Sequence, residues 1–467
     1  MRILYDDDAV QAVYRPGSSD FTLITFGDKD LRPAPGRFWA GEPAEQLNLD
    51  CIGIVAKGPN WYPAAAMVRC APFLSGVGRQ RRLGYGYSMG GYAALRHGRL
   101  LGLTHALAVS PQVSLDPRDV PWDRRYAAHF DPALHAGMAV RREHLADETF
   151  VLADPWDAED GAHLRLALEA GPLRSVVAPF VGHWAIWLLA GRSVLARALA
   201  CVLAGDAPGL RRLVRSGRGA CAPWHACLGA AALRRGHVGP ALRLAAQAEA
   251  RGFDAAVLEP MLAHGAGVAL SRLVASGATA EDLARFGEAA SGLVAAARID
   301  DAVGHALLRA DRDEEAALAF RRALSADPGL GSAHGGLSLA LARLGRAEEA
   351  LTHARQAHAL DPADAELAAW VGYVLLQSGR AEEAVGMFET GIRLNPGMGH
   401  AHRARARALR DLGLGPEAAA AAEEGCRAVP SDAALRQLAD ELRPHLERGG
   451  ERRTGWLRLP GSAPTRP

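Results

Sequence analysis

The stretch Gly86-Tyr87-Ser88-Met89-Gly90-Gly91-Tyr92 decides the fold expected for the first part of the chain. It follows a β-type run, Leu83 to Tyr87, and opens an alanine-rich segment of helical character, Tyr92 to Leu101. A strand, a tight turn and a helix around Gly-x-Ser-x-Gly are the context of a nucleophile elbow. Glycine two residues to either side of the serine removes clashes with the adjoining strand and helix. The motif therefore predicts that Ser88 is a nucleophile at a helix N-terminus, where the helix dipole stabilises negative charge.

Short β-type runs alternate with helical stretches on both sides of this motif, up to about residue 190. Several of the runs are continuously apolar, as expected for strands buried on both faces of a sheet. Residues 2–5 and 9–14 flank an acidic turn and are expected to pair as an N-terminal hairpin. Strand and helix in alternation predict a doubly wound, mostly parallel α/β sheet. Its other predicted strands are residues 21–26, 51–56, 83–87, 106–109, 149–153 and 175–181.

The serine motif and this order of elements make residues 1–205 resemble a compact member of the α/β-hydrolase superfamily, of the serine esterase or thioesterase type. The resemblance implies a catalytic triad in the chain order Ser, then Asp or Glu, then His. Its histidine is expected just after the last strand, where Val181-Gly182-His183-Trp184 stands. His183 is therefore the expected general base, which takes the Ser88 proton and later returns it to the leaving group.

Three aspartates follow the strand at 149–153, where the resemblance implies the acid of the triad. Asp157 is preferred, because it holds the last position of a Gly-x-x-Asp pattern in which Asp154 replaces the glycine. Asp154 is the second choice and Asp160 the third. Whichever residue serves would orient His183 and stabilise its imidazolium.

The resemblance also implies an oxyanion hole made of two backbone amides. One is expected from Met89, directly after the nucleophile, and the other from Gly27 in the turn after residues 21–26. The loop after the next strand carries polar and aromatic side chains that we expect to line a substrate pocket, namely Asn60, Trp61 and Tyr62.

A further segment, residues 111–147, lies where many relatives insert a lid. It is too short for a large cap domain, and its aromatic residues Trp122, Tyr126 and Phe130 are candidates to face the pocket. A fairly open site would suit a bulky or macromolecule-attached ester.

After residue 191 the sequence becomes helical and contains a repeat. Arg346-Ala-Glu-Glu-Ala350 recurs 34 residues later as Arg380-Ala-Glu-Glu-Ala384. A period of 34 residues with helix–turn–helix content is typical of tetratricopeptide repeats. Phe320 and Phe388 are expected to fill the space between paired helices, while Gly304 and Gly372 take the small position of the first helix. The prolines that punctuate the repeats share the same spacing: Pro328, Pro362, Pro396 and Pro430.

These patterns predict four regions. A hydrolase-like domain at 1–205 is followed by a helical region at 206–296, in which a degenerate repeat starts near Ala222. Repeats and a terminal helix are expected at 297–445. The tail, 446–467, is rich in Arg, Gly and Pro and is predicted to be disordered.

Composition narrows the function further. The chain has 53 basic and 52 acidic residues, which argues against general binding to nucleic acid or to a membrane surface. No apolar run approaches the ~20 residues needed to span a bilayer. The first residues are acidic and do not form a secretory signal, and six scattered cysteines make no disulfide framework. These features lead us to expect a cytoplasmic protein.

No cofactor or metal is expected from the sequence. Neither lysine belongs to a Walker loop, and no glycine-rich dinucleotide motif follows a strand. Cys221, His225 and Cys227 lie close together, but their spacing matches no common zinc pattern, so we expect free thiols in a helical array.

Three functions remain open at this stage. The first is hydrolysis of an ester or thioester through an acyl-enzyme on Ser88, with the repeats recruiting a protein partner or the substrate. The second is a tetratricopeptide adaptor whose hydrolase-like domain is inactive, and the third is acyl transfer from the same serine. In the last repeat, Arg403, Arg407 and Arg410 share a helical face. They would clamp a carboxylate or an acidic peptide, unless they form an ordinary solvated basic face.

Overall fold

The computed structural model describes residues 1–454. The chain divides into two compact units, Met1–Met261 and Leu262–Pro467. The predicted limits at residues 205 and 296 thus lie inside these units, and residues 206–261 belong to the N-terminal unit.

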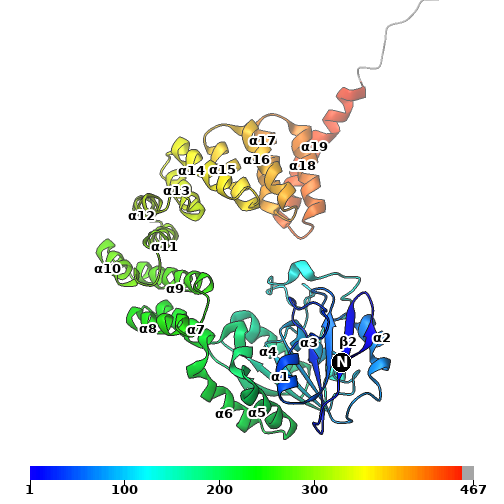
Figure 1. Cartoon of the computed structure of the whole chain (residues 1–467). Helices are drawn as coiled ribbons and strands as arrows, with labels where there is room; N and C mark the ends of the chain where they lie inside the picture. Colours follow the sequence, from blue (N-terminus) through cyan, green and yellow to red (C-terminus); the bar gives the residue numbers. More distant parts are fainter. Residues whose placement is uncertain (455–467) are drawn as a thin grey trace, which may run out of the picture. The chain divides into compact units, whose positions relative to one another are not determined.

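The N-terminal unit contains an eight-stranded mixed sheet (Figure 1), in the order β1-β2-β4-β3-β5-β6-β7-β8. Strand β2 is antiparallel to both of its neighbours, β1 and β4, and the other neighbouring pairs are parallel. The predicted N-terminal hairpin and the mostly parallel sheet are confirmed. The strands are β1 (Arg2–Asp6), β2 (Val10–Arg15), β3 (Thr22–Phe26), β4 (Asp50–Ala56), β5 (Arg82–Tyr87), β6 (His105–Val109), β7 (Glu148–Ala153) and β8 (Arg174–Val177).

Helices cover both faces of this sheet. Alternate residues of β3 enter two separate cores: Leu23 packs in one and Ile24 in the other. The core of Ile24 includes helices α2 (Ala64–Leu74), α3 (Met89–Arg96) and α4 (Ala158–Ala170). The core of Leu23 includes α1 (Gly41–Gln46), α5 (Arg192–Leu203) and α6 (Ala207–Gly217). This two-sided burial explains why the strands are apolar without alternation.

The register of the parallel strands brings several chemistry-bearing turns to one edge. Phe26 pairs with Gly86, and Tyr87 pairs with Val109. The order of the strands reverses at β3, because β4 lies on one side of it and β5 on the other. In open α/β sheets, ligands bind at such a switch point, outside the carboxyl ends of the strands. Ser88 follows β5 at that position.

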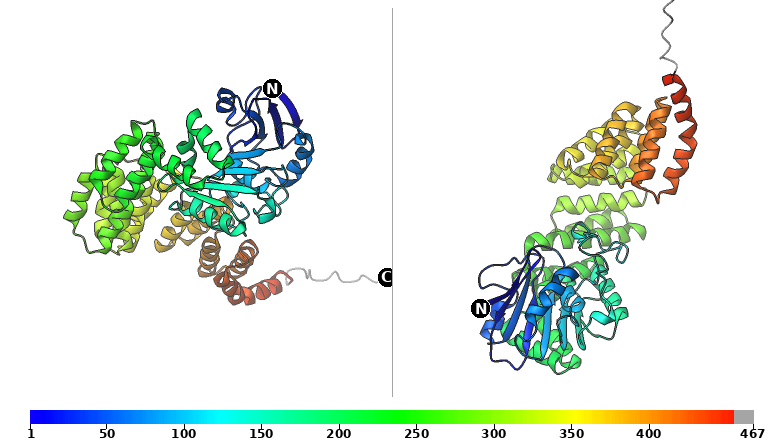
Figure 2. Two further views of the ribbon diagram at one scale, coloured as in Figure 1. Left: turned by 90° about the horizontal axis from the view of Figure 1, so that it is seen from below. Right: turned by 90° about the vertical axis from the view of Figure 1, so that its right-hand side faces the viewer.

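After the sheet the chain is helical, and its helices lie in pairs in both units (Figures 1 and 2). The predicted degenerate repeat is a helical hairpin. Its two helices pack closely, because a Cβ added at Gly229 would lie 3.3 Å from the Leu244 Cβ. The helices after α6 are α7 (Ala222–Arg234), α8 (Val238–Glu249), α9 (Ala255–Ala275), α10 (Ala280–Ala290), α11 (Ala296–Arg309), α12 (Asp313–Ala326), α13 (Gly331–Arg343), α14 (Ala347–Leu360), α15 (Ala365–Gln377), α16 (Ala381–Leu394), α17 (Gly399–Asp411), α18 (Gly415–Ala428) and α19 (Ala433–Thr454).

The packing inside the repeats follows the predicted pattern. Phe320 is fully buried, and a Cβ added at Gly304 or Gly336 would lie 2.6 or 2.2 Å from its ring. Phe388 has the same relation to Gly372, at 2.8 Å. The glycines therefore let consecutive helices close over each phenylalanine. Residues 446–454 of the predicted tail belong to α19, and residues 455–467 lie outside the described residues.

Candidate active site

Ser88 occupies a strained turn between β5 and α3. Its φ is 53° and its ψ is −118°, a backbone conformation that residues other than glycine rarely adopt. A Cβ at Gly86 would lie 2.1 Å from the Gly90 carbonyl oxygen, and one at Gly90 would lie 2.3 Å from that of Phe26. The two glycines are thus needed for strand, turn and helix to pack this closely, and such local strain is typical of functional sites.

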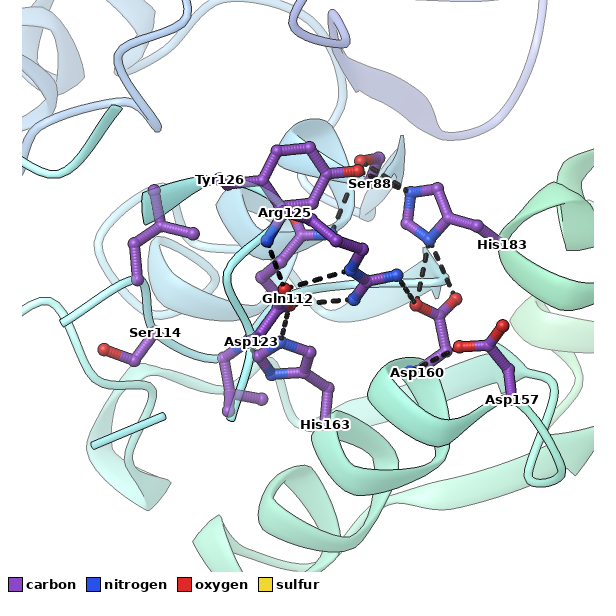
Figure 3. Close-up of polar contacts among 12 residues, drawn as sticks. Ser88, Gln112, Ser114, Asp123, Arg125, Tyr126, Asp157, Asp160, His163 and His183 are labelled. Atoms are coloured by element: carbon purple, nitrogen blue, oxygen red, sulfur yellow. Dashed lines mark hydrogen bonds and ion pairs between the residues drawn. The ribbon is translucent and has the colours of Figure 1, made fainter. Parts of the chain in front are cut away.

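The structure brings Ser88 and His183 together (Figure 3). The Ser88 Oγ lies 2.9 Å from the His183 Nε2. His183 is the second residue of a 3-10 helix, η3 (Gly182–Leu189), that follows β8. The backbone turns tightly where it enters η3. Phe180 and Gly182 both have positive φ there, at 64° and 55°. The tight turn aims the imidazole back across the sheet edge toward the serine.

The carboxylate that contacts His183 is Asp160, the least favoured of the three predicted acids. The His183 Nδ1 lies 2.9 Å from the Asp160 Oδ1 and 2.8 Å from its Oδ2. A carboxylate only accepts hydrogen bonds. The proton of the imidazole therefore sits on Nδ1, which leaves Nε2 free to accept the Ser88 hydroxyl proton.

The preference for Asp157, and then Asp154, is corrected by the bonds that these two residues make. Asp157 is the N-cap of α4, and its Oδ1 accepts the Asp160 backbone N–H at 2.9 Å. Asp154 accepts the backbone N–H groups of Val181 and Gly182 at 2.8 and 2.9 Å. Asp157 thus holds the start of the helix that carries Asp160, and Asp154 holds the turn before His183.

Asp160 and Asp157 differ in the direction in which their surroundings shift their pKa values. Burial alone would raise the pKa of Asp160, but hydrogen bonding to His183 and the charge of Arg125 lower it below its ordinary value. Burial raises the pKa of Asp157, against the opposing effect of its capping bond. Asp160 is therefore the carboxyl held in its charged form beside the imidazole.

Two further polar side chains near the site were missed at the sequence level. Arg125, from the segment between β6 and β7, places its Nη1 2.8 Å from the Asp160 Oδ1. Asp123 accepts from the other edge of the same guanidinium, with its Oδ2 2.8 Å from the Arg125 Nη2. Three aromatic residues of this segment, Trp122, Tyr126 and Phe130, were expected near the pocket, and the Tyr126 hydroxyl oxygen does lie 3.3 Å from the His183 Nε2.

Gln112, also missed, presents its amide nitrogen to the serine. The Trp61 Nε1 lies 3.2 Å from the Gln112 Oε1, and the Gln112 Nε2 lies 3.5 Å from the Ser88 Oγ. Indole nitrogen is only a donor, so the Gln112 oxygen must face Trp61 and the amide N–H groups must face Ser88. Gln112 is fully buried, which fixes this orientation.

The three predicted pocket residues have different surroundings. Trp61 is 1% exposed and packs against Tyr126, with ring centroids 5.2 Å apart and the rings tilted by 53°. Tyr62 is fully buried, and its hydroxyl donates to the Gly27 carbonyl oxygen at 2.8 Å, so it belongs to the core rather than to a pocket wall. Asn60 donates to the Ala9 carbonyl oxygen at 2.8 Å and shapes the loop. Of the three, only Trp61 contacts residues that reach Ser88 or His183.

The two predicted oxyanion donors also differ. Met89 is the first residue of α3, and the first N–H groups of a helix have no partner within it. The Gly27 N–H, by contrast, donates to the Ile54 carbonyl oxygen at 3.2 Å. Gly27 is therefore engaged in the sheet, and the next amide of the same turn, that of Asp28, takes its place as a candidate donor.

The arginine face predicted in the last repeat is largely neutralised. Arg403 forms an ion pair with Asp432, and Arg410 forms one with Asp411 at 2.9 Å. Arg407 is exposed on the same helix, α17. A clamp of three free arginines is thus not what the structure contains.

Residues 1–454 contain no group of three or more His, Cys, Asp or Glu side chains arranged to hold a metal ion. Burial raises the pKa of the Cys227 thiol to about 12.

Within the same described range, no single helix is long and apolar enough to cross a membrane. Only η3 and α5, taken together across a bend of 99°, have the required length and composition.

Comparison with known proteins places tetratricopeptide repeats in the C-terminal part of the chain. A family model described as tetratricopeptide repeat matches residues 302–365 and 372–433. None of the curated proteins compared with the chain matches it. Tetratricopeptide repeats build extended surfaces that bind proteins, so this part of the chain has a protein-interaction role.

Several solved structures resemble parts of the chain. YrrB, described as a tetratricopeptide-repeat protein with an unusual peptide-binding site, is 23% identical over 37% of this chain and 88% of its own, with a TM-score of 0.31. An O-GlcNAc transferase mutant of Thermobaculum terrenum is 26% identical over 28% of this chain and 26% of its own, with a TM-score of 0.27. A MamA double mutant is 19% identical over 38% and 94%, with a TM-score of 0.31.

Proposed function

We propose that the N-terminal unit is a serine hydrolase of the α/β-hydrolase type, which cleaves a carboxylic ester or thioester through an acyl-enzyme on Ser88. The observation that carries the proposal is the unbroken relay from the Ser88 Oγ to His183 at 2.9 Å and on to Asp160 at 2.8 Å. Its members follow β5, β7 and β8 in the chain order Ser, Asp, His, which is the order of this class.

Each group has a defined task in the proposed reaction. His183 accepts the Ser88 proton at Nε2 while the Oγ attacks the carbonyl carbon. The backbone N–H groups of Met89 and Asp28 stabilise the oxyanion that forms. His183 then returns the proton to the leaving alcohol or thiol. A water molecule, activated by the same imidazole, hydrolyses the acyl-enzyme, and the Asp160 carboxylate stabilises the imidazolium in both halves.

The tetratricopeptide repeats would recruit a protein that carries the ester or thioester or that needs the activity nearby. Two alternatives share parts of this account. Acyl transfer uses the same acyl-enzyme with another acceptor in place of water. An adaptor with an inactive hydrolase-like unit would keep the protein-binding role of the repeats alone.

Labelling with a fluorophosphonate probe tests the proposal. The wild-type chain should be labelled on Ser88, and the Ser88→Ala and His183→Ala variants should not be, because the probe reacts only with an activated serine hydroxyl. Labelling would lead to a screen of esters and thioesters of increasing chain length. A folded wild type that takes no label would refute the proposal and favour the adaptor.

A further inference from the structure

Arg125 reaches the proposed catalytic acid from a segment outside the triad. The segment between Val109 and Glu148 has no regular strand, and Arg125 lies near its middle. The guanidinium bridges two carboxylates (Figure 3): the Nη1 contacts Asp160 at 2.8 Å, and the Nε and Nη2 contact Asp123 at 3.0 and 2.8 Å. Two-point contacts of this kind fix the plane of the guanidinium as well as its position.

Asp123 is itself held from behind. The His163 Nε2–H donates to the Asp123 Oδ2 at 2.9 Å, and the His163 Nδ1 accepts the Val113 N–H at 3.3 Å. His163 lies on α4, three residues after Asp160, so both ends of the chain of contacts rest on one helix. His163 is fully buried and Asp160 is 2% exposed. The arrangement is therefore a closed loop of polar contacts in which both carboxylates and the His163 imidazole are buried and Arg125 is partly exposed.

The loop has a net charge of one negative, because the arginine balances one of the two carboxylates. Burial would raise the pKa of Asp123, but its bonds to His163 and Arg125 lower it below the ordinary value, so both carboxylates are ionised. The imidazole of His183 contacts this loop through Asp160. The charge on Arg125 and Asp123 must therefore influence how readily His183 takes a proton.

We propose that Arg125 and Asp123 are positioning residues, which fix the Asp160 carboxylate and set the proton affinity of His183. This inference rests on the proposed triad. Arg125 offsets one of the two negative charges beside the imidazole, and Asp123 keeps Arg125 from cancelling the charge of Asp160. Removing either residue then changes the net charge beside His183 in the opposite direction.

The other groups around His183 stay constant in this comparison. Burial raises the pKa of Tyr87 and of Tyr126, whose rings face the imidazole, so both are neutral near pH 7. The Cys227 thiol, beside Gly182, is neutral as well, because burial raises its pKa to about 12. The charge of Asp28, in the turn after β3, acts on Tyr87 and is unchanged in every variant.

The test compares charge-removing variants. Arg125→Gln leaves two carboxylates near His183 and should move the titration of the imidazole to higher pH. Asp123→Asn leaves Arg125 to cancel the charge of Asp160 and should move the same titration to lower pH. Arg125→Lys keeps the charge but loses the two-point contact of the guanidinium. The titration of the imidazole should therefore stay as in the wild type, while kcat/KM falls about tenfold to a hundredfold.

The chain offers a matched control. Arg118 makes the same fork on Asp116, two residues before it, with the Nε and Nη2 at 3.0 and 2.6 Å from its two oxygens. The Arg118 side chain is 83% exposed, and its hydrogen bonds and ion pair are with Asp116. Arg118→Gln should leave both the pKa of His183 and kcat/KM unchanged.

Two readouts separate this inference from the proposed function. The first is the acid limb of the pH profile of kcat/KM, which reports the base of the free enzyme. The second is a nuclear magnetic resonance titration of the imidazole in the Ser88→Ala background, which needs no activity; the His183 signal is the one lost in His183→Gln. Absence of turnover in the wild type would contradict the proposed function alone.

Opposite shifts in Arg125→Gln and Asp123→Asn would support the inference. Shifts in the same direction, or none, in variants that retain the wild-type circular dichroism and cooperative melting would overturn it. If Asp123→Asn does not fold, the contrast between Arg125→Gln and Arg125→Lys decides, because only loss of the charge should move the titration.

Discussion

Replacing Asp160 by Asn is the sharpest perturbation of the proposed triad. Arg125 donates to the Asp160 Oδ1 at 2.8 Å, so it should bind the amide oxygen of the asparagine. The amide NH2 would then occupy the place of the Oδ2, 2.8 Å from the His183 Nδ1. There it can only donate, which moves the imidazole proton to Nε2 and removes the acceptor for the Ser88 hydroxyl.

The expected loss follows from this wrong tautomer. In serine enzymes the equivalent change lowers kcat about 10⁴-fold, which corresponds to roughly 5 kcal/mol of transition-state stabilisation. Asp157→Asn is the control, because asparagine caps a helix as well as aspartate does and activity should stay within about threefold. The assay is kcat/KM on a nitrophenyl ester series, together with the rate of fluorophosphonate labelling. The reasoning fails if Asp160→Asn keeps a tenth of the wild-type activity, or if Asp157→Asn loses as much.

Three further predictions concern the neighbouring contacts and the repeats. Gln112→Leu removes the amide nitrogen that lies 3.5 Å from the Ser88 Oγ. It should lower kcat about tenfold to a hundredfold with little change in KM. A rise in KM of the same size would instead indicate a role in substrate binding. Because the pKa of Asp123 is lower when folded, its contribution to stability is complete above the unfolded pKa of about 3.9 and is lost as the pH falls below it. The melting temperature of the wild type should therefore fall more steeply below pH 4 than that of Asp123→Asn, and parallel curves would contradict this. Gly336→Ala places a Cβ 2.2 Å from the Phe320 ring and should destabilise the chain by about 1–3 kcal/mol in urea unfolding, whereas Gly386→Ala, which meets no atom within 4 Å, should be neutral or slightly stabilising.

Local sequence was enough to predict the parts of the site that one turn determines. The glycines around Ser88 must be glycines because the backbone atoms of Gly90 and Phe26 lie 2.1 and 2.3 Å from where their Cβ atoms would be. His183 could be placed because it follows the last strand. The 34-residue spacing likewise predicted that Phe320 is buried between small residues, since each repeat can bury its apolar face only against its neighbours.

The sequence favoured the wrong aspartate as the partner of His183, because three aspartates, Asp154, Asp157 and Asp160, lie close together around the start of α4. Which of them faces the imidazole depends on where α4 begins. Asp157 is its N-cap and bonds the Asp160 N–H at 2.9 Å, which leaves Asp160 pointing at the site. The Asp-x-x-Asp capping pattern occurs twice here, as Asp154-Pro-Trp-Asp157 and Asp157-Ala-Glu-Asp160, so the sequence does not show which aspartate is the cap.

Long-range contacts account for the remaining misses. Arg125 and Gln112 lie in a segment without regular secondary structure, and their contacts with Asp160 and Ser88 join residues 35 and 24 positions apart. No periodicity marks such residues. Gly27 was misassigned for a related reason, because the sequence does not show that its N–H closes the β3–β4 ladder on Ile54.

The most direct test of the central claim is mass spectrometry of the protein quenched during turnover of an activated ester. The account predicts one acyl group per chain, attached to the peptide that contains Ser88, and no adduct in Ser88→Ala. An acyl group on another residue, or ester hydrolysis that continues unchanged in Ser88→Ala, would contradict it.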